Sequence, residues 1–164
     1  MLGKPEDGWA LFQLGSEETA YDLSYVTDVA MEWLVQAIHG LQTMDVFSVH
    51  GFCEPGRVIC TVSYWCCYVI FEEDDRSPAC HDVRHLHVNM LDFCKMLHQD
   101  ISEHLDAWVH WNDVYVDWDD GDDGVEAMKT ALELREKTLR EKLIELKSLI
   151  EQRQEDFEEG HCFI

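Results

Sequence analysis

Basic residues are scarce in this chain. Twelve Lys and Arg stand against 34 Asp and Glu in 164 residues, which gives a formal net charge of −22 at pH 7. Nucleic acids and anionic membranes bind proteins through a basic surface, so the charge disfavours both as partners. Phosphate-bearing substrates are disfavoured for the same reason. The sequence also has no glycine-rich phosphate loop and no HExxH or GxSxG motif.

Targeting and membrane segments are not expected either. Met1–Ala10 has neither the basic start nor the apolar core of a secretory signal. No run reaches the roughly 18 apolar residues of a membrane helix. We therefore expect a cytoplasmic protein, whose seven cysteines are reduced.

Hydrophobic residues are plentiful. They make up 46% of the chain and include six Trp, so the high charge does not indicate disorder. A folded domain with an acidic surface is the better interpretation, and the length suffices for a sizeable core. Halophilic adaptation is a competing explanation of the acidity, although seven cysteines and many large aromatics argue against it.

The most strand-like stretch is Arg57–Phe71, RVICTVSYWCCYVIF. Its β-branched and aromatic residues favour a buried strand. Because 15 residues are too many for one straight strand, a bulge or bend near Ser63–Tyr64, or a tight turn, is expected. Glu54-Pro55-Gly56 supplies a turn that connects this stretch to an expected strand at Asp45–Phe52.

Two amphipathic helices are predicted on either side of these strands. Thr27–Gln42 and Asn89–Val109 carry apolar residues at helical spacing. The first residue of Thr27–Gln42 can serve as its N-cap, and Gly40 marks its end. The second helix opens on an Asn three residues before Asp92, which resembles a capping box. Arg76–His87 is expected to be a loop.

The C-terminal part is predicted to be one long helix over Val125–Glu159. Its apolar stripe is interrupted by Arg135 and Lys142, which leaves a coiled coil possible but not secure. The expected fold class is α+β: an antiparallel sheet packed against the two amphipathic helices, with this long C-terminal helix. Residues 1–124 are expected to form the acidic α+β domain. Residues 125–164 are expected to be a helix of the same domain or a dimerising appendage.

The acidity is concentrated in the first of these parts. Residues 1–124 hold 24 acids and 5 bases, a net charge of −19, whereas residues 125–164 hold 10 acids and 7 bases, a net charge of −3; the two sums give −22. A strongly acidic body favours fast, salt-sensitive association with a basic protein.

The segment Trp111–Gly124, WNDVYVDWDDGDDG, mixes aspartates with aromatic residues around a possible short edge strand at Val114–Val116. Its spacing does not fit an EF-hand, so calcium is a weak interpretation. A solvated loop and a docking loop for a basic protein are the alternatives, since aromatic anchors within a charged rim suit an interface. The candidate partner-binding residues are Asp113, Asp117, Trp118, Asp119, Asp120, Asp122 and Asp123, together with the acidic run Glu72, Glu73, Asp74 and Asp75.

Metal and thiol chemistry are further alternatives. Cys80, His81, His85 and His87 could bind zinc, but their spacing matches none of the strong zinc patterns. Cys53, beside the predicted turn, is the most plausible exposed thiol for a Cys/His pair. No local signature supports either, so we expect a protein that is not an enzyme, with no catalytic residue, no metal site and no cofactor.

The chain as a whole resembles the small acidic immunity proteins of bacterial polymorphic or contact-dependent toxin systems. The resemblance lies in size, acidity, α+β pattern and lack of catalytic motifs, and Ser24–Phe71 is similar to small bacterial α+β proteins. It implies stoichiometric inhibition of a basic toxin domain, possibly a nuclease, whose substrate groove the acidic surface would occupy. The alternatives are a homo-oligomeric adaptor or scaffold built on the C-terminal helix, with a homodimer possible, and a metal- or thiol-dependent enzyme.

Overall fold

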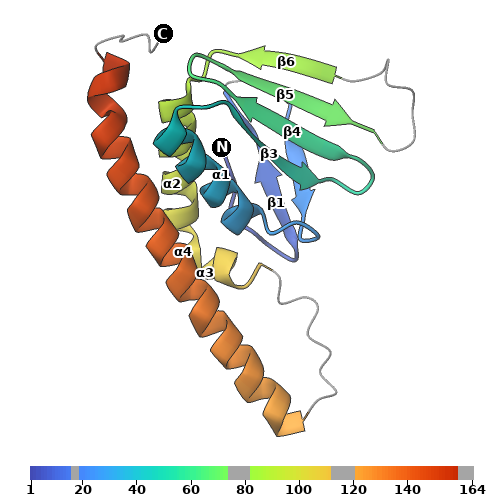
Figure 1. Ribbon diagram of the computed structural model, residues 1–164. Helices are drawn as coiled ribbons and strands as arrows, with labels where there is room; N and C mark the ends of the chain where they lie inside the picture. Colours follow the sequence, from blue (N-terminus) through green and yellow to red (C-terminus); the bar gives the residue numbers. More distant parts are fainter. Residues whose placement is uncertain (16–18, 74–81, 112–120, 159–164) are drawn as a thin grey trace.

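A computed structural model describes residues 1–15, 19–73, 82–111 and 121–158 (Figure 1). Side chains are described for these residues except Asp82 and residues 121–124. In chain order the elements are β1 (Trp9–Phe12), β2 (Tyr21–Ser24), α1 (Val29–Thr43), β3 (Phe47–Phe52), β4 (Arg57–Val62), β5 (Cys67–Glu72), β6 (Asp82–Leu86), α2 (Met90–Glu103), α3 (Leu105–Val109) and α4 (Gly121–Glu158).

The strands form two antiparallel sheets. β1 pairs with β2, and β3, β4, β5 and β6 form a meander in which each strand pairs with the next. With the helices, and with a long helix at the end, the α+β fold class predicted from the sequence is confirmed. No helix in the described part of the chain is both long and apolar enough to cross a membrane.

The stretch Arg57–Phe71 is a hairpin. Of the two expectations for it, a bulge or bend within one strand and a tight turn, the tight turn is therefore correct. β4 and β5 are joined through Ser63–Cys66, where the Ser63 N–H donates to the Cys66 carbonyl at 2.9 Å. The Ser63 hydroxyl also accepts from the Cys66 N–H at 3.1 Å. A side chain that bonds the backbone of its own turn stabilises the reversal without needing glycine.

The first helix differs from the prediction at both ends. Its N-cap is Asp28, not Thr27, because the Asp28 carboxylate accepts from the Met31 N–H at 3.3 Å. At the other end α1 continues past Gly40 to a cap at Met44, which has a left-handed φ of 60°. Gly40 is buried, and a Cβ there would overlap the Phe47 ring. This glycine therefore lets β3 approach the helix and does not end it.

Two further predictions for the middle of the chain are wrong in part. The expected loop Arg76–His87 contains β6, which pairs with β5 over five residues. The expected single helix Asn89–Val109 is divided at His104 into α2 and α3. The predicted N-cap is confirmed, because the Asp92 N–H donates to the Asn89 side chain at 2.8 Å. The second bond differs from that of a capping box: the Asn89 side-chain amide, and not its backbone N–H, donates to the Asp92 carboxylate at 2.9 Å.

The helices α1 and α2 lie between the four-stranded sheet and α4 (Figure 1). The hydrophobic core fills both interfaces. Phe47, Val49 and Val58 enter it from the sheet, and α4 contributes Leu139, Leu143 and Leu146. The C-terminal helix begins at Gly121, four residues before the predicted start, and covers the body along the helical layer.

Candidate functional site

Most of the acidic candidates lie outside the described residues. This holds for the possible strand Val114–Val116 and for Asp74, Asp75, Asp113, Asp117, Trp118, Asp119 and Asp120. Asp122 and Asp123 lie in the first turn of α4, with side chains outside the description. Glu72 and Glu73 are the two candidates whose side chains lie within the described residues.

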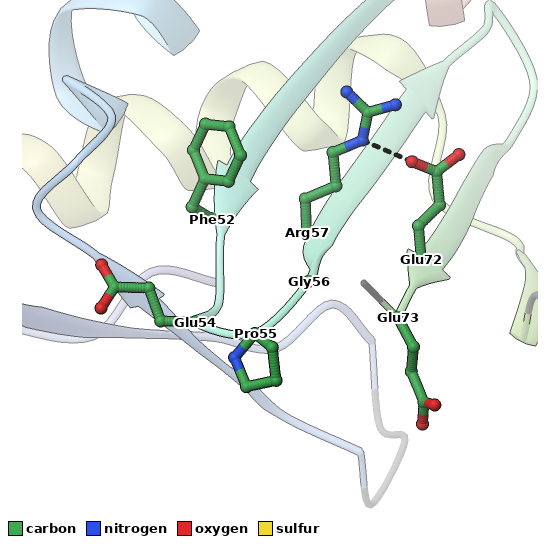
Figure 2. A pocket seen from close by; sticks show the side chains of 7 residues that line it. All are labelled: Phe52, Glu54, Pro55, Gly56, Arg57, Glu72 and Glu73. Carbon is green, nitrogen blue, oxygen red and sulfur yellow. Dashed lines mark hydrogen bonds and ion pairs between the residues drawn. The ribbon is translucent and has the colours of Figure 1, made fainter. Parts of the chain in front are cut away.

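Glu72 and Glu73 line an open groove of about 490 Å³ at one end of the four-stranded sheet (Figure 2). We call it the turn groove. It is built from the end of β3, the turn that follows, the start of β4 and the end of β5. Its residues are Phe52, Glu54, Pro55, Gly56, Arg57, Glu72 and Glu73.

Strand register determines how the side chains of the turn groove are arranged. Phe52 is the cross-strand partner of Arg57, and Arg57 is the partner of Glu72, so the three lie side by side across β3, β4 and β5. Figure 2 shows them projecting to the same side, with Glu73 pointing away. Glu73 directly follows the last residue of β5, and successive residues of an extended chain face opposite sides, so the groove presents carboxylates on both sides of this end of the sheet.

The turn itself is held by specific contacts. The Cys53 N–H donates to the Gly56 carbonyl at 2.9 Å, and the buried Ser24 hydroxyl donates to the Glu54 carboxylate. Gly56 has a φ of 96°, and a Cβ there would lie 2.5 Å from the Glu72 carbonyl oxygen. Only glycine combines this dihedral with such a close approach, as the predicted turn required.

The electrostatics of the turn groove are negative. Three carboxylates, those of Glu54, Glu72 and Glu73, line the groove with one guanidinium, that of Arg57, which forms an ion pair with Glu72. Phe52, in the same groove, is 39% exposed. Carboxylates bind a guanidinium or ammonium group by charge-assisted hydrogen bonds, and an exposed aromatic ring binds such a group by cation–π contact.

The candidate zinc residues are only partly described. Cys80 and His81 lie outside the description. The rings of His85 and His87 are 4.9 Å apart at an angle of 75°, and His85 lies 5.0 Å from the Tyr68 ring. Among the described residues, no group of three or more His, Cys, Asp or Glu is arranged to hold a metal ion.

The Cys53 thiol is half-buried, and burial raises its pKa to about 11. Since the thiolate is the reactive form, iodoacetamide should alkylate Cys53 about 100-fold more slowly in the folded protein than in the denatured chain at pH 7.5. Mass spectrometry of the Cys53 peptide over time measures both rates. A folded-state rate equal to or above the denatured rate would identify an activated thiol and revive the enzyme alternative.

A second groove, of about 270 Å³, lies between α2 and α4 and carries basic residues. It is lined by Arg140 and Lys147, with His98 at its wall. Burial lowers the pKa of His98, and the nearby charge of Lys147 lowers it further. Arg140 is already bonded to Glu136 at 2.6 Å. Compared with this basic groove, the turn groove is larger and carries the opposite charge.

Sequence reasoning missed one lining residue of the turn groove, Phe52, and one residue that supports its turn, Ser24. Phe52 was treated as the end of a strand, and Ser24 was not considered. The signal for Phe52 was present: pairing counted outward from the Ser63–Cys66 turn places Arg57 opposite Glu72, and the next turn places Phe52 opposite Arg57. Ser24 comes from a separate hairpin, 30 residues before Glu54, and no local pattern links them.

Fold and site together define an α+β protein with an acidic groove at the end of an antiparallel meander. No protein-family model matches the chain, and comparisons with curated proteins and with solved structures found no match.

Proposed function

We propose that this protein binds a basic protein at the turn groove and inhibits it by forming a stoichiometric complex, as an immunity protein does with its toxin. One observation carries the proposal. On a chain of net charge −22, Glu54, Glu72 and Glu73 line an open groove together with the exposed Phe52.

The groove supports recognition of a Lys or Arg side chain of the partner. The lining of the groove holds three carboxylates and one guanidinium, and the exposed ring of Phe52 adds an apolar surface. Steering by the net charge would raise the association rate, and the aromatic contact would slow dissociation. The acidic run continues along the chain from Glu73 into Asp74 and Asp75, which would extend the contact toward the size of a specific interface.

Inhibition follows from the same chemistry. A basic enzyme that acts on nucleic acid needs its Lys and Arg residues for phosphate contacts. Carboxylates that occupy those residues exclude the substrate. The adaptor alternative has less support, because Leu139, Leu143 and Leu146 of the C-terminal helix are buried within the chain.

The test is affinity capture from the source lysate at low and high salt, with three immobilised proteins. They are the wild type, the double variant Phe52→Ala/Glu73→Lys, and the control Leu134→Ala/Glu133→Lys. The control makes the same change of charge and the same type of apolar loss at exposed positions of α4. We expect the wild type and the control to retain one basic protein at low salt, and the groove variant to lose it.

With that partner purified, the groove variant should bind about 10- to 100-fold more weakly than the control, the range expected when an interface anchor and its charge are removed. Equal affinity of the two variants would reject the turn groove as the site. Failure of the wild type to retain any basic protein from the source lysate at low salt would reject the function.

A further inference from the structure

The four-stranded sheet has a second face, which none of the described helices covers. Strand residues alternate between faces, and one set, including Phe47, Val49 and Val58, is buried against the helices. The other set points outward. We call this second set the outer sheet face, and strand register divides it into three rows. The first row is Ser48, Thr61, Tyr68 and His85, the middle row is His50, Ile59, Ile70 and Val83, and the third row is Phe52, Arg57 and Glu72.

The outer sheet face is unusually apolar for an open face. In an antiparallel sheet with one buried side, the solvent side is normally polar. Here Ile59 and Ile70 lie at the centre, and Phe52, Tyr68 and Val83 around them are 39%, 41% and 56% exposed. Contiguous exposed apolar residues of this kind mark an interaction surface.

The outer sheet face also lacks the acidity of the rest of the molecule. Its first two rows contain no Asp or Glu, although 34 of the 164 residues are acidic. The third row contains Glu72, which is paired with Arg57. Glu32 of α1 adjoins at one edge, 3.9 Å from the His50 ring nitrogen. A basic partner would find little opposite charge over the centre of this face.

The distribution of charge favours a second copy as the occupant. Two molecules of charge −22 repel each other over most of their surfaces. The repulsion is weakest where a surface has no carboxylates or only paired ones. The outer sheet face meets this condition, and it also carries the exposed apolar residues. A two-fold contact brings the same patch of each copy together, so Ile59, Ile70 and Val83 of the middle row, with the neighbouring Phe52 and Tyr68, would be buried against the same residues of the other copy.

We propose that the protein forms a homodimer by stacking the outer sheet faces of two copies. Four strands about 4.8 Å apart, each about 18 Å long, present a face of about 300 Å² in projection. That is less than half of the ~800 Å² that each partner buries in a standard interface. The dimer is therefore weak and concentration-dependent. It uses Phe52 and Arg57 of the turn groove, so it competes with the basic partner, although it does not depend on that partner's existence.

Sedimentation equilibrium over a range of protein concentrations, at low and high salt, tests the proposal. Salt screens the repulsion between the two acidic molecules, so the dimer should strengthen as salt rises, opposite to a complex with a basic partner. A wild type that sediments as a monomer at every concentration and salt level would overturn the proposal.

Two variants locate the contact. Val83→Glu places a carboxylate in the middle row of the outer sheet face, twice per dimer, and should weaken the dimer at least about tenfold. Ile144→Glu makes the same change at a residue of α4 that is 71% exposed, and should leave the dimer unchanged. Both positions are exposed, so both variants should keep the wild-type melting temperature. Equal dimer dissociation constants for the Val83→Glu and Ile144→Glu variants would show that the outer sheet face is not the dimer interface.

Discussion

Replacing Leu139 by alanine should lower the free energy of unfolding by about 3 kcal/mol, within the range for a buried Leu→Ala change. Leu139 is fully buried in the interface between α4 and the α1–α2 layer. The substitution removes apolar burial and leaves a cavity that the surrounding helices can fill only in part. Urea or thermal unfolding followed by circular dichroism measures the change.

Leu134 is the matched control. It lies on the same helix and is 63% exposed, so Leu134→Ala should change the unfolding free energy by less than about 0.5 kcal/mol. Similar small effects at both positions would mean that α4 does not pack on the body. A single cooperative transition for the wild type, seen by every probe, is the companion expectation. By the same reasoning, a chain ending at Gly124 would leave the core face of α1 and α2 uncovered and should not fold.

Arg135→Met should be the most destabilising change of a charged residue in α4. The Arg135 guanidinium is 16% exposed and bonds both carboxylate oxygens of Asp28, one of them at 2.8 Å. It also donates to the Trp108 carbonyl at 3.2 Å. Methionine keeps much of the packing but leaves a half-buried carboxylate and a carbonyl without these donors. We expect a loss of about 2–3 kcal/mol.

Arg140 provides the control and Asp28 the partner test. Arg140 forms an i, i+4 pair with Glu136 at the surface, and Arg140→Met should change stability by less than about 0.5 kcal/mol. In a double-mutant cycle, Asp28→Ala and Arg135→Met should be coupled by more than about 1 kcal/mol. Additive effects would show that the pair contributes no interaction energy, and that the loss at Arg135 is one of packing alone.

Arg135 also shows where sequence reasoning reached its limit. The sequence pattern identified Arg135 as an interruption of the apolar stripe of the C-terminal helix, and this was correct. The residue that satisfies it lies 107 positions earlier, at the N-cap of α1, and helical spacing carries no information about that distance. A charge in an apolar stripe predicts a partner but does not identify it.

Local patterns predicted what depends on neighbours in sequence. The helix of α1, the Asn89 N-cap and the turn at Gly56 all follow from residues within a few positions. β6 was missed because its five residues carry little apolar alternation, and their pairing with β5 makes them a strand. Gly40 was misread for the same reason: the ring of Phe47, which requires the glycine, lies on another element.

The candidate site was predicted only in part. Glu72 and Glu73 were identified from charge alone, but their association with Phe52 and Glu54 depends on the register of three strands. Most of the aspartate segment, the most distinctive acidic feature of the sequence, lies outside the described residues, which omit 112–120. Its role in partner binding stays a prediction.

The bonds between α4 and α1 have a consequence for synthesis of the protein. Arg153 donates to the carbonyls of Leu41 and Gln42, 112 and 111 residues earlier in the chain. While the ribosome is still making α4, the apolar side of α1 that α4 will cover has no neighbour there. Because domains gain their long-range contacts only when both segments have emerged, the nascent chain is exposed to chaperones and proteases until its last helix is released.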